Sequence, residues 1–366
     1  MTGIYIHVPF CLRKCPYCDF YSRSYSPELA ESYVSAAKRS ISAYSGMGIT
    51  ADTVYFGGGT PSLLTPGQVS EILDSVSDTV TLCSPEITLE ANPSSISSEK
   101  LCGWRSAGVN RLSIGFQSAD DAQLGFLGRL HDTDRACRAV LDASAAGFDN
   151  ISCDLMIGLK GQDSASLDRT LDRMLSLPVS HLSAYMLKIE QGTAFDTDEV
   201  RSSVPDDDTV SDMYLQLCGR MSAAGYEHYE ISNWAKNGRR SRHNMKYWTL
   251  EPYIGIGPAA HSDLGGKRFY CPADITQFID SKVQKTVQED DHPDRTREYV
   301  MLGLRLSDGI TRERLSQLGG ADFADSVFSK AAPLVKNGLM TISGDRAALT
   351  EQGFLLSNAV ILHLLG

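Results

Sequence analysis

Residues 4–20 read IYIHVPFCLRKCPYCDF, a short apolar strand pattern that runs directly into three closely spaced cysteines. Similar apolar or β-branched runs recur through the first half of the chain, each followed by a helical pattern. The six runs cover residues 4–7, 53–56, 86–90, 111–115, 151–155 and 181–187. Strands that alternate with helices predict an α/β fold built on a parallel sheet.

The helical patterns between these runs carry start and stop signals. Ser26-Pro27 and Thr65-Pro66 each place a capping hydroxyl before a proline, and Gln68 completes a capping box with Thr65. The tripeptide Ala-Gly followed by an apolar residue lies at the ends of three helical patterns, with glycines at 108, 147 and 225. A repeat near 40 residues also fits a helical solenoid, but the strand runs favour βα units. Six units predict a partial (βα)6 TIM-like barrel, with ligands at the carboxyl ends of its strands.

We expect three regions along the chain. Residues 1–205 form the partial barrel, and residues 206–290 form a flanking segment. This segment opens with an acidic linker at 206–208, continues as a helix to about residue 224, and is then irregular to about residue 270. Residues 291–366 form a small C-terminal α+β or helical domain whose pattern fits a winged helix. Winged helices often bind DNA, but the net charge of −11 and the lack of a clustered basic helix favour a role in packing or partner binding.

Composition narrows the class of protein. With 42% hydrophobic and 22% charged residues, the chain is of globular and not of disordered or fibrous type. The excess of 45 acidic over 34 basic side chains argues against broad binding to nucleic acid or anionic membranes. We find no signal-peptide pattern and no apolar stretch of membrane-spanning length, so we expect a cytoplasmic protein. Cysteines stay reduced there, and a close cluster of them indicates metal or redox chemistry.

Cys11, Cys15 and Cys18 form such a cluster, just after the first strand. Three thiolates at this spacing can converge on one metal centre. Zinc would need a fourth nitrogen or sulfur ligand, and His7 is the nearby candidate, whereas an iron–sulfur cubane with three protein ligands leaves one iron open. The alternative is three unrelated loop cysteines. The other six cysteines are scattered and predicted to be small buried apolar residues.

Polar residues recur where the predicted strands end. Glu90, Gln117 and Asp154 close or follow the third, fourth and fifth strands, and Arg129 could pair with a carboxylate. A run of three glycines at 57–59 suits close approach of a ligand, or simply a tight turn. Each residue alone is more often a surface charge or a structural hydrogen bond. Together they are better explained by one common ligand.

The Cys-x3-Cys-x2-Cys spacing of Cys11, Cys15 and Cys18 resembles the signature of the radical S-adenosylmethionine (SAM) superfamily. The resemblance implies a 4Fe-4S cluster held by these three thiolates, with SAM bound at the open iron. It also implies an external electron donor, a 5′-deoxyadenosyl radical, and a partial six-stranded barrel as the fold.

The resemblance is closer to one family, the oxygen-independent coproporphyrinogen III dehydrogenases. Residues 5–11, 57–61, 90–93, 111–117 and 154–158 carry it, and it extends over nearly the whole chain. The SAM contacts that it implies are Tyr5, Tyr17, Gly58, Gly59, Thr60, Glu90, Gln117, Arg129, Asp154 and Lys188.

Three features resemble the heme-chaperone members of this family more than its dehydrogenases. Phe20 stands where the dehydrogenases have a fourth cysteine, and three residues precede Ile4 where they carry an extension. Residues 243–248 read HNMKYW, the His-Asn-x-x-Tyr-Trp motif of the chaperones. This resemblance implies heme as cargo and an unidentified acceptor, such as a respiratory-chain protein. The alternative is radical oxidation of the propionates of coproporphyrinogen, and no catalytic residue is assigned.

The motif also suits heme on chemical grounds. The imidazole of His243 is a standard axial ligand for heme iron, and Tyr247 and Trp248 offer flat faces for a macrocycle. The nearby cations that could neutralise two propionates are Arg239, Arg240 and Arg242. A core histidine beside buried aromatic side chains is the alternative. His261 is the second candidate ligand.

Overall fold

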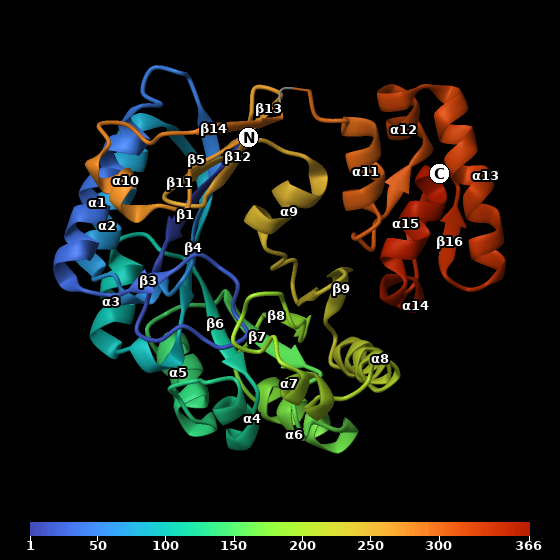
Figure 1. Ribbon diagram of the computed structural model, residues 1–366, viewed down its shortest axis with the longest axis horizontal. Coiled ribbons are helices and arrows are strands. Elements are labelled where there is room, and N and C mark those ends of the chain that lie inside the picture. Colours follow the sequence, from blue (N-terminus) through green and yellow to red (C-terminus); the bar gives the residue numbers. More distant parts are fainter. Residues whose placement is uncertain (291) are drawn as a thin grey trace.

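The structure, a computed structural model, describes residues 1–290 and 292–366. A strongly curved sheet carries helices along its outer side, and a smaller unit of helices and short strands lies at one end (Figure 1). All six predicted runs are strands, and they lie side by side in chain order, each parallel to the next. They are β1 (Thr2–Val8), β4 (Thr50–Gly58), β5 (Thr81–Ala91), β6 (Arg111–Gln117), β7 (Ile151–Ile157) and β8 (His181–Met186). The predicted α/β class with a partial barrel is confirmed.

The first two helices that connect these strands begin where the capping signals predicted. Ser26 accepts a hydrogen bond from the Leu29 amide at the start of the first helix, and the Thr65–Gln68 capping box is complete at the start of the second. The helices are α1 (Pro27–Ser42), α2 (Pro66–Thr79), α3 (Ser98–Ser106), α4 (Asp121–Phe126), α5 (Thr133–Ala145) and α6 (Ser164–Leu175). Single 3₁₀ turns follow two strands at η1 (Pro61–Leu63) and η2 (Pro93–Ser95).

The two faces of the parallel sheet differ in polarity because side chains alternate along each strand. Outward-facing residues such as Ile6, Phe56 and Leu89 are fully buried in the apolar core that the helices cover. The alternate positions face the inside of the barrel and are largely polar. On this inner face lie Tyr5, Thr53, Tyr55, Glu86, Thr88, Glu90, Arg111, Ser113, Ser152, Asp154, His181 and Ser183.

The sheet continues beyond the six parallel strands to 12 strands in the order β14-β13-β12-β11-β1-β4-β5-β6-β7-β8-β10-β9, so the barrel does not close. The added strands are β9 (Glu227–Glu230), β10 (Asn233–Ala235), β11 (Tyr253–Ile256), β12 (His261–Leu264), β13 (Lys267–Tyr270) and β14 (Val287–Asp290). The expectation of irregular structure up to about residue 270 was therefore wrong. These strands are four residues or fewer, too short to give a clear alternating pattern.

Four helices accompany these added strands: α7 (Asp198–Ser203), α8 (Asp207–Ala223), α9 (Arg242–Thr249) and α10 (Ile275–Asp280). The acidic run at 206–208 is not a linker but the start of α8. Asp206 caps the helix by accepting a hydrogen bond from the Thr209 amide, and Asp207 and Asp208 lie in its first turn. Carboxylates are favourable there because the N-terminus of a helix carries partial positive charge.

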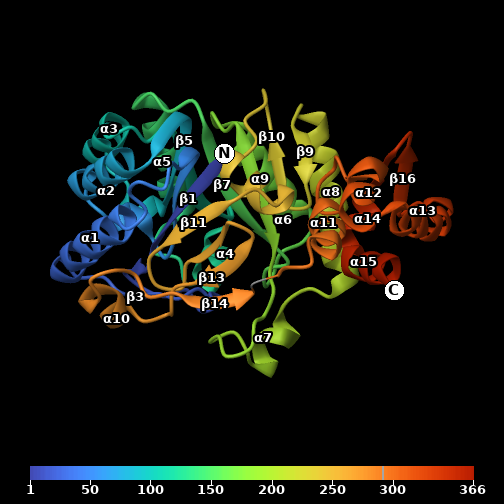
Figure 2. The same ribbon diagram turned by 90° about the horizontal axis from the view of Figure 1, so that it is seen from above.

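The C-terminal unit has its own sheet, in the order β15-β17-β16. Its elements are α11 (Arg295–Gly303), β15 (Ile310–Thr311), α12 (Arg312–Gly319), α13 (Ala321–Lys336), β16 (Met340–Ser343), β17 (Arg346–Leu349), α14 (Glu351–Leu355) and α15 (Ser357–Leu365). The order helix, strand, two helices, two strands is that of a winged helix. Seen from above, this unit lies beside α8 and β9 (Figure 2).

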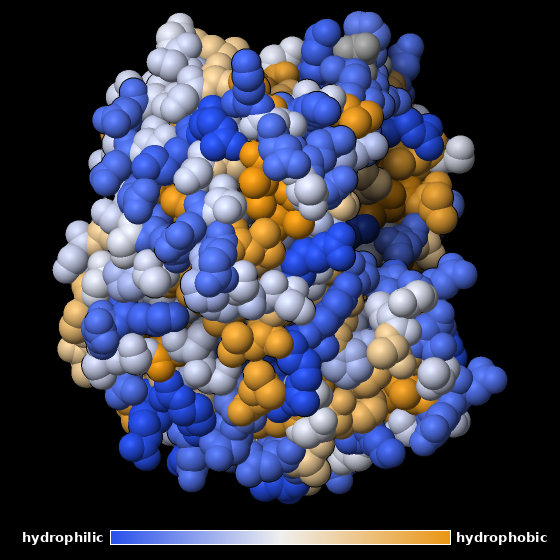
Figure 3. All heavy atoms as spheres, turned by 60° about the vertical axis from the view of Figure 1, so that its left-hand side comes forward, coloured by the Kyte–Doolittle hydropathy of each residue, from blue (hydrophilic) through white to orange (hydrophobic). Residues whose placement is uncertain are grey.

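The surface gives no sign of a membrane-embedded helix. Over the residues that the structure describes, every helix is too short or too polar to cross a bilayer. On the face shown in Figure 3, apolar side chains form small patches separated by polar ones.

Candidate functional site

A cavity of about 580 Å³ opens at the carboxyl ends of the parallel strands. Cys11, Cys15 and Cys18 line it, and so does every residue that was predicted to contact SAM. Those residues are Tyr5, Tyr17, Gly58, Gly59, Thr60, Glu90, Gln117, Arg129, Asp154 and Lys188. They come from positions 5–188 of the chain, and the barrel brings them around one space.

The cysteine loop is tied to the barrel at both ends. Its first residues form β2 (Phe10–Cys11), which pairs with β3 (Arg23–Ser24), and all three cysteines are half-buried and free of disulfides. The Thr60 hydroxyl lies 3.7 Å from Cys11 Sγ, and Arg129 Nη1 lies 3.7 Å from Cys15 Sγ. Burial raises the pKa of Cys11 and of Cys18. Free thiols with such donors beside them fit the thiolates of a 4Fe-4S cluster, whose sulfurs accept hydrogen bonds.

The glycine run packs the end of β4 against the cysteine loop. Gly59 and Thr60 donate backbone hydrogen bonds to Val8 and Phe10 carbonyls, at 2.9 and 2.7 Å. A Cβ atom on Gly59 would lie 2.6 Å from the Phe10 carbonyl oxygen, and Gly58 has a φ of 108° that favours glycine. The packing of the protein therefore explains why both positions are glycine, without a ligand.

Glu90 and Asp154 are the acidic groups of the cavity floor. Glu90 accepts hydrogen bonds from the Tyr55 hydroxyl, at 2.7 Å, and from the Gly58 amide, at 3.2 Å. Asp154 accepts one from the Ser113 hydroxyl at 3.2 Å. Burial raises the pKa of Glu90 to about 7, with a contribution from the Asp154 charge, and burial raises the pKa of Asp154 as well. Neither carboxylate has an ion-pair partner among the described residues, so both can accept a cationic or hydroxyl-bearing ligand.

Arg129 and Gln117 face the cavity across Gly115. Arg129 donates from Nη2 to the Gly115 carbonyl at 3.0 Å, but its buried Nε has no hydrogen-bond partner in the described part of the chain. A Cβ atom on Gly115 would lie 2.8 Å from Arg129 Nη2 and 3.0 Å from Gln117 Nε2. Gln117 itself has a φ of 70°, which is rare for a residue with a side chain. An unpaired buried donor beside a strained residue is typical of a binding site.

The remaining predicted contacts are less constrained by the protein. Tyr5 is hydrogen-bonded to His7 Nδ1 at 3.0 Å, and the Tyr17 ring lies 6.2 Å from the Phe195 ring. Lys188 is exposed and paired with Glu190 at 2.6 Å. His7 is held by Tyr5 and by the Tyr21 carbonyl, which leaves both of its ring nitrogens occupied within the protein. It is therefore not poised as a fourth zinc ligand.

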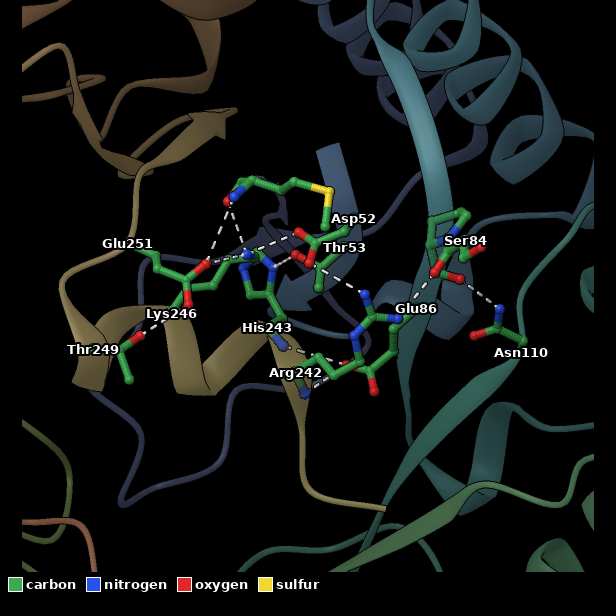
Figure 4. Close-up of polar contacts among 12 residues, drawn as sticks. Asp52, Thr53, Ser84, Glu86, Asn110, Arg242, His243, Lys246, Thr249 and Glu251 are labelled. Atoms are coloured by element: carbon green, nitrogen blue, oxygen red, sulfur yellow. Dashed lines mark hydrogen bonds and ion pairs between the residues drawn. The ribbon is translucent and has the colours of Figure 1, made fainter. Parts of the chain in front are cut away.

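The motif at 243–248 forms α9, which lies on the inner side of the sheet (Figure 1). His243 is 1% exposed, and its ring is hydrogen-bonded to Thr53 Oγ1 at 2.8 Å and to the Tyr247 hydroxyl at 2.9 Å. Burial lowers the pKa of His243 to about 3, helped by the charge of Lys246. The arrangement matches the alternative of a core histidine, because both ring nitrogens have partners. Figure 4 shows the contact with Thr53.

The other residues of the predicted heme site are dispersed. Tyr247 lines the cavity, whereas Trp248 lies beside Arg305 of the C-terminal unit, 5.9 Å from ring centre to guanidinium carbon. His261 is exposed on β12, 3.3 Å from Glu289. The three arginines are engaged elsewhere: Arg239 with Asp149, Arg240 with Glu227 and Asp308, and Arg242 with Asp52 and the Ser84 carbonyl. In the absence of heme, all three arginines are therefore paired with acidic side chains of the protein.

The sequence analysis did not predict several residues that line the cavity. Tyr55 and Ser113, which hold the two carboxylates, occupy inward positions of β4 and β6. Strand alternation could have indicated both, since each is two residues or a multiple of two from another inward-facing residue. Tyr185, at the end of β8, and Asn244, on α9, also line the cavity. Nothing in the local sequence around Asn244 indicates that it reaches this cavity.

Comparison with known proteins agrees with this geometry. Residues 5–174 match the family model of the radical SAM superfamily, and residues 290–356 match that of the HemN C-terminal domain. The coproporphyrinogen III oxidase HemN of Escherichia coli, a radical SAM enzyme, superposes with a TM-score of 0.83 over 99% of this chain and 89% of that chain. At 20% sequence identity this similarity concerns the fold.

Relatives at higher identity match over the full length. The heme chaperone HemW of Bacillus subtilis is 35% identical, with all of both chains covered. The heme chaperone HemW of Escherichia coli is 34% identical over 98% of this chain and 97% of that one. The resemblance predicted from the cysteine spacing and the strand-end motifs is confirmed, and the chain belongs to the HemW family of the radical SAM superfamily.

Proposed function

We propose that this protein is a heme chaperone that carries a 4Fe-4S cluster and SAM, binds heme and transfers it to an acceptor protein. The observation that carries the proposal is the full-length similarity, at 34–36% identity, to proteins named heme chaperones. The heme acceptor and the electron donor to the cluster are further proteins with which it would interact, and we place this exchange in the cytoplasm.

The cavity supports the cofactor part of the proposal. Cys11, Cys15 and Cys18 would hold the cluster, which when bound supplies an electron and an open iron for SAM. Glu90 and Asp154 would bind the cationic and hydroxyl groups of SAM, and the unpaired Nε of Arg129 would donate to its carboxylate. The remaining predicted SAM contacts line the same space.

The heme part of the proposal depends on α9. Tyr247 presents its ring to the cavity, and the His243 imidazole lies directly behind its hydroxyl. Ligation of heme iron by His243 would require Tyr247 to release Nε2 and α9 to move away from the sheet. Trp248 would contribute from the side of α9 that faces Arg305. The exposed imidazole of His261 needs no such movement and is the competing ligand.

The alternative is a coproporphyrinogen III dehydrogenase, as the resemblance of the sequence to that family implies. Phe20 argues against it, since this exposed side chain lines the cavity at the place where the dehydrogenases carry a fourth cysteine.

One sample can distinguish the two functions. Cluster-reconstituted protein should bind about one heme per chain in a spectroscopic titration, and it should leave coproporphyrinogen unchanged in the presence of SAM and a reductant. His243→Ala and His261→Ala, titrated in parallel, identify the ligand by a shifted Soret band. Robust decarboxylation of coproporphyrinogen would establish the alternative, and failure to bind heme would end the chaperone proposal.

A further inference from the structure

A second group of metal-ligating side chains lies outside the cavity, where the barrel meets the C-terminal unit. Cys218 on α8, His228 on β9 and Glu351 on α14 each direct one potential ligand atom to the same place, and these three atoms lie within 4.8 Å of one another. The three elements lie side by side in both ribbon views (Figures 1 and 2). Thiol, imidazole and carboxylate together are a typical donor set for zinc.

The spacing suits an ion better than direct contact. His228 Nδ1 and Glu351 Oε1 are 4.0 Å apart, which is too long for a hydrogen bond. Tetrahedral zinc, bound about 2.1 Å from nitrogen and oxygen, needs the two atoms about 3.4 Å apart, so the half-exposed Glu351 side chain would move about 0.6 Å toward His228. Cys218 Sγ lies close enough to complete a three-ligand set after a small contraction. A water molecule can take the fourth position, because Glu351 is 48% exposed and the site borders solvent there.

The surroundings of His228 hold its ring in the orientation that ligation requires. The ring stacks on Trp234, with centroids 4.3 Å apart and an interplanar angle of 12°. Its Nε2 lies 3.5 Å from the Tyr214 hydroxyl, which donates its own proton to the Ile231 carbonyl. In the tautomer that carries its proton on Nε2, Tyr214 accepts the hydrogen bond and the lone pair on Nδ1 is free for an ion. Second-shell hydrogen bonds of this kind usually fix metal-bound histidines.

Burial favours ligation by His228 and opposes it at Cys218, whose thiol must lose its proton. Burial lowers the pKa of His228 to about 4, so the imidazole is neutral at pH 7, as a ligand must be. Burial raises the pKa of Cys218 to about 12, so the free side chain is a thiol and would release one proton when an ion binds.

From this geometry we propose that Cys218, His228 and Glu351 form a zinc site that links the barrel to the C-terminal unit. The site is separate from the cysteine cluster at Cys11, Cys15 and Cys18, and its existence does not depend on the proposed function. Its expected effect is on the docking of α14 against α8 and β9, because the ion would be shared between the two parts of the molecule.

The test uses the cluster-reconstituted protein, incubated with excess zinc and then passed through a desalting column under anaerobic conditions. Wild-type protein should retain one zinc per chain beside its cluster iron. Zinc-edge X-ray absorption, which iron does not obscure, should show one sulfur at about 2.3 Å with the remaining ligands nitrogen or oxygen. Zinc should also raise the melting temperature of the wild-type protein.

Three variants make the test specific. Cys218→Ala should lose the zinc, the sulfur shell and the thermal shift. Glu351→Gln changes a half-exposed carboxylate, should fold normally and should bind zinc at least tenfold more weakly. Cys271→Ala is the matched control, because Cys271 is also a buried thiol whose pKa burial raises to about 12, and it should keep the zinc.

The proposal is overturned if wild-type protein retains no zinc, or if Cys218→Ala and Glu351→Gln retain as much zinc as the wild type. A shell of three sulfurs would also overturn it, since the zinc would then occupy Cys11, Cys15 and Cys18 in molecules that lack the cluster.

Discussion

The two ends of the barrel interior are built from the same strands and differ in how their polar groups are satisfied. At the carboxyl ends, Glu90 and Asp154 have no cationic partner among the described residues, and the buried Nε of Arg129 has no hydrogen bond. At the amino ends, α9 covers the strands, and Lys246, 3% exposed, is ion-paired with Asp52 and Glu251 at 2.8 Å each (Figure 4).

Other charged side chains at the amino ends of the strands also have hydrogen-bond or ion-pair partners. Glu86 accepts hydrogen bonds from the amides of Arg242 and His243, and Arg242 is paired with Asp52. A polar interior is costly to bury unless each group finds a partner. The protein pairs the charged groups that contact α9, whereas the buried Arg111, at the start of β6, keeps two nitrogens without a hydrogen-bond partner among the described residues. The carboxyl-end groups are left to a ligand, so substitutions should affect binding at the carboxyl end and stability around α9.

The largest effect is expected for the cysteine cluster. Cys15→Ala removes one of three protein ligands, and we expect loss of a stable 4Fe-4S cluster because no other cysteine lies near enough to replace it. Iron and sulfide analysis after anaerobic reconstitution should fall from about four of each per chain to a small residue. Cys137→Ala, at a buried position away from the cavity, is the control and should keep its iron. Zinc without sulfide in the wild type would contradict the cluster.

The next largest effect is on stability, at the amino end. Lys246→Met keeps most of the side-chain volume but leaves Asp52 and Glu251 without their shared cation. Asp52 keeps its pair with Arg242, and Glu251 is 44% exposed, so neither carboxylate is left buried and unpaired. We expect a loss of up to about 3 kcal/mol in the free energy of unfolding, measured by urea denaturation. Iron content after reconstitution should not change.

The matched control for Lys246 is Lys38→Met. Lys38 is also 2.8 Å from a carboxylate, Glu71, but its side chain is 41% exposed, and such a surface pair contributes about 1 kcal/mol or less. Equal losses in the two variants would mean that α9 is not held by buried charge.

A smaller effect is expected on SAM affinity at the carboxyl end. Asp154→Ala and Gln117→Ala should each weaken SAM binding by about 1–3 kcal/mol, the cost of leaving a buried ligand group unpaired. Thr53→Ala, which removes the hydrogen bond to His243 at the amino end, should leave SAM affinity unchanged. Calorimetry on the three reconstituted variants measures the contrast, and a loss confined to Thr53→Ala would reverse our assignment of the two ends.

The contrast between the two ends also explains what the sequence could predict. The sequence predicted the strand runs, the capping box and the strand-end residues Glu90, Gln117 and Asp154. It could do so because these features depend on local pattern and on chain order within a parallel sheet. The place of α9 depends on pairing between Lys246 and Asp52, almost 200 residues apart, and no local signal reports it. The carboxylates that pair with Arg239 and Arg240 are also distant in sequence, so these arginines could be interpreted as a propionate site but their ion pairs could not be predicted.

The smallest expected effect is a pH dependence that arises from Glu90. Its pKa is raised to about 7 by burial, above its ordinary value of 4.5. In the ligand-free protein the protonated form is favoured, so the stabilising contribution of Glu90 is complete below about pH 4.5 and is lost as the pH rises through about 7. Binding of SAM should show the opposite slope, because the ionised carboxylate is the form that attracts its positive charge.

We therefore expect SAM affinity to rise by up to about tenfold between pH 6 and pH 8, as Glu90 loses its proton. Glu90→Gln should bind SAM with little pH dependence and should lose less stability over the same range when no ligand is present. The comparison must be made between the two proteins at each pH, because the buried Glu230, with a pKa of about 8, titrates nearby in both. A parallel rise in wild type and Glu90→Gln would assign the pH dependence to another group, and the cavity floor would then bind SAM through neutral hydrogen bonds.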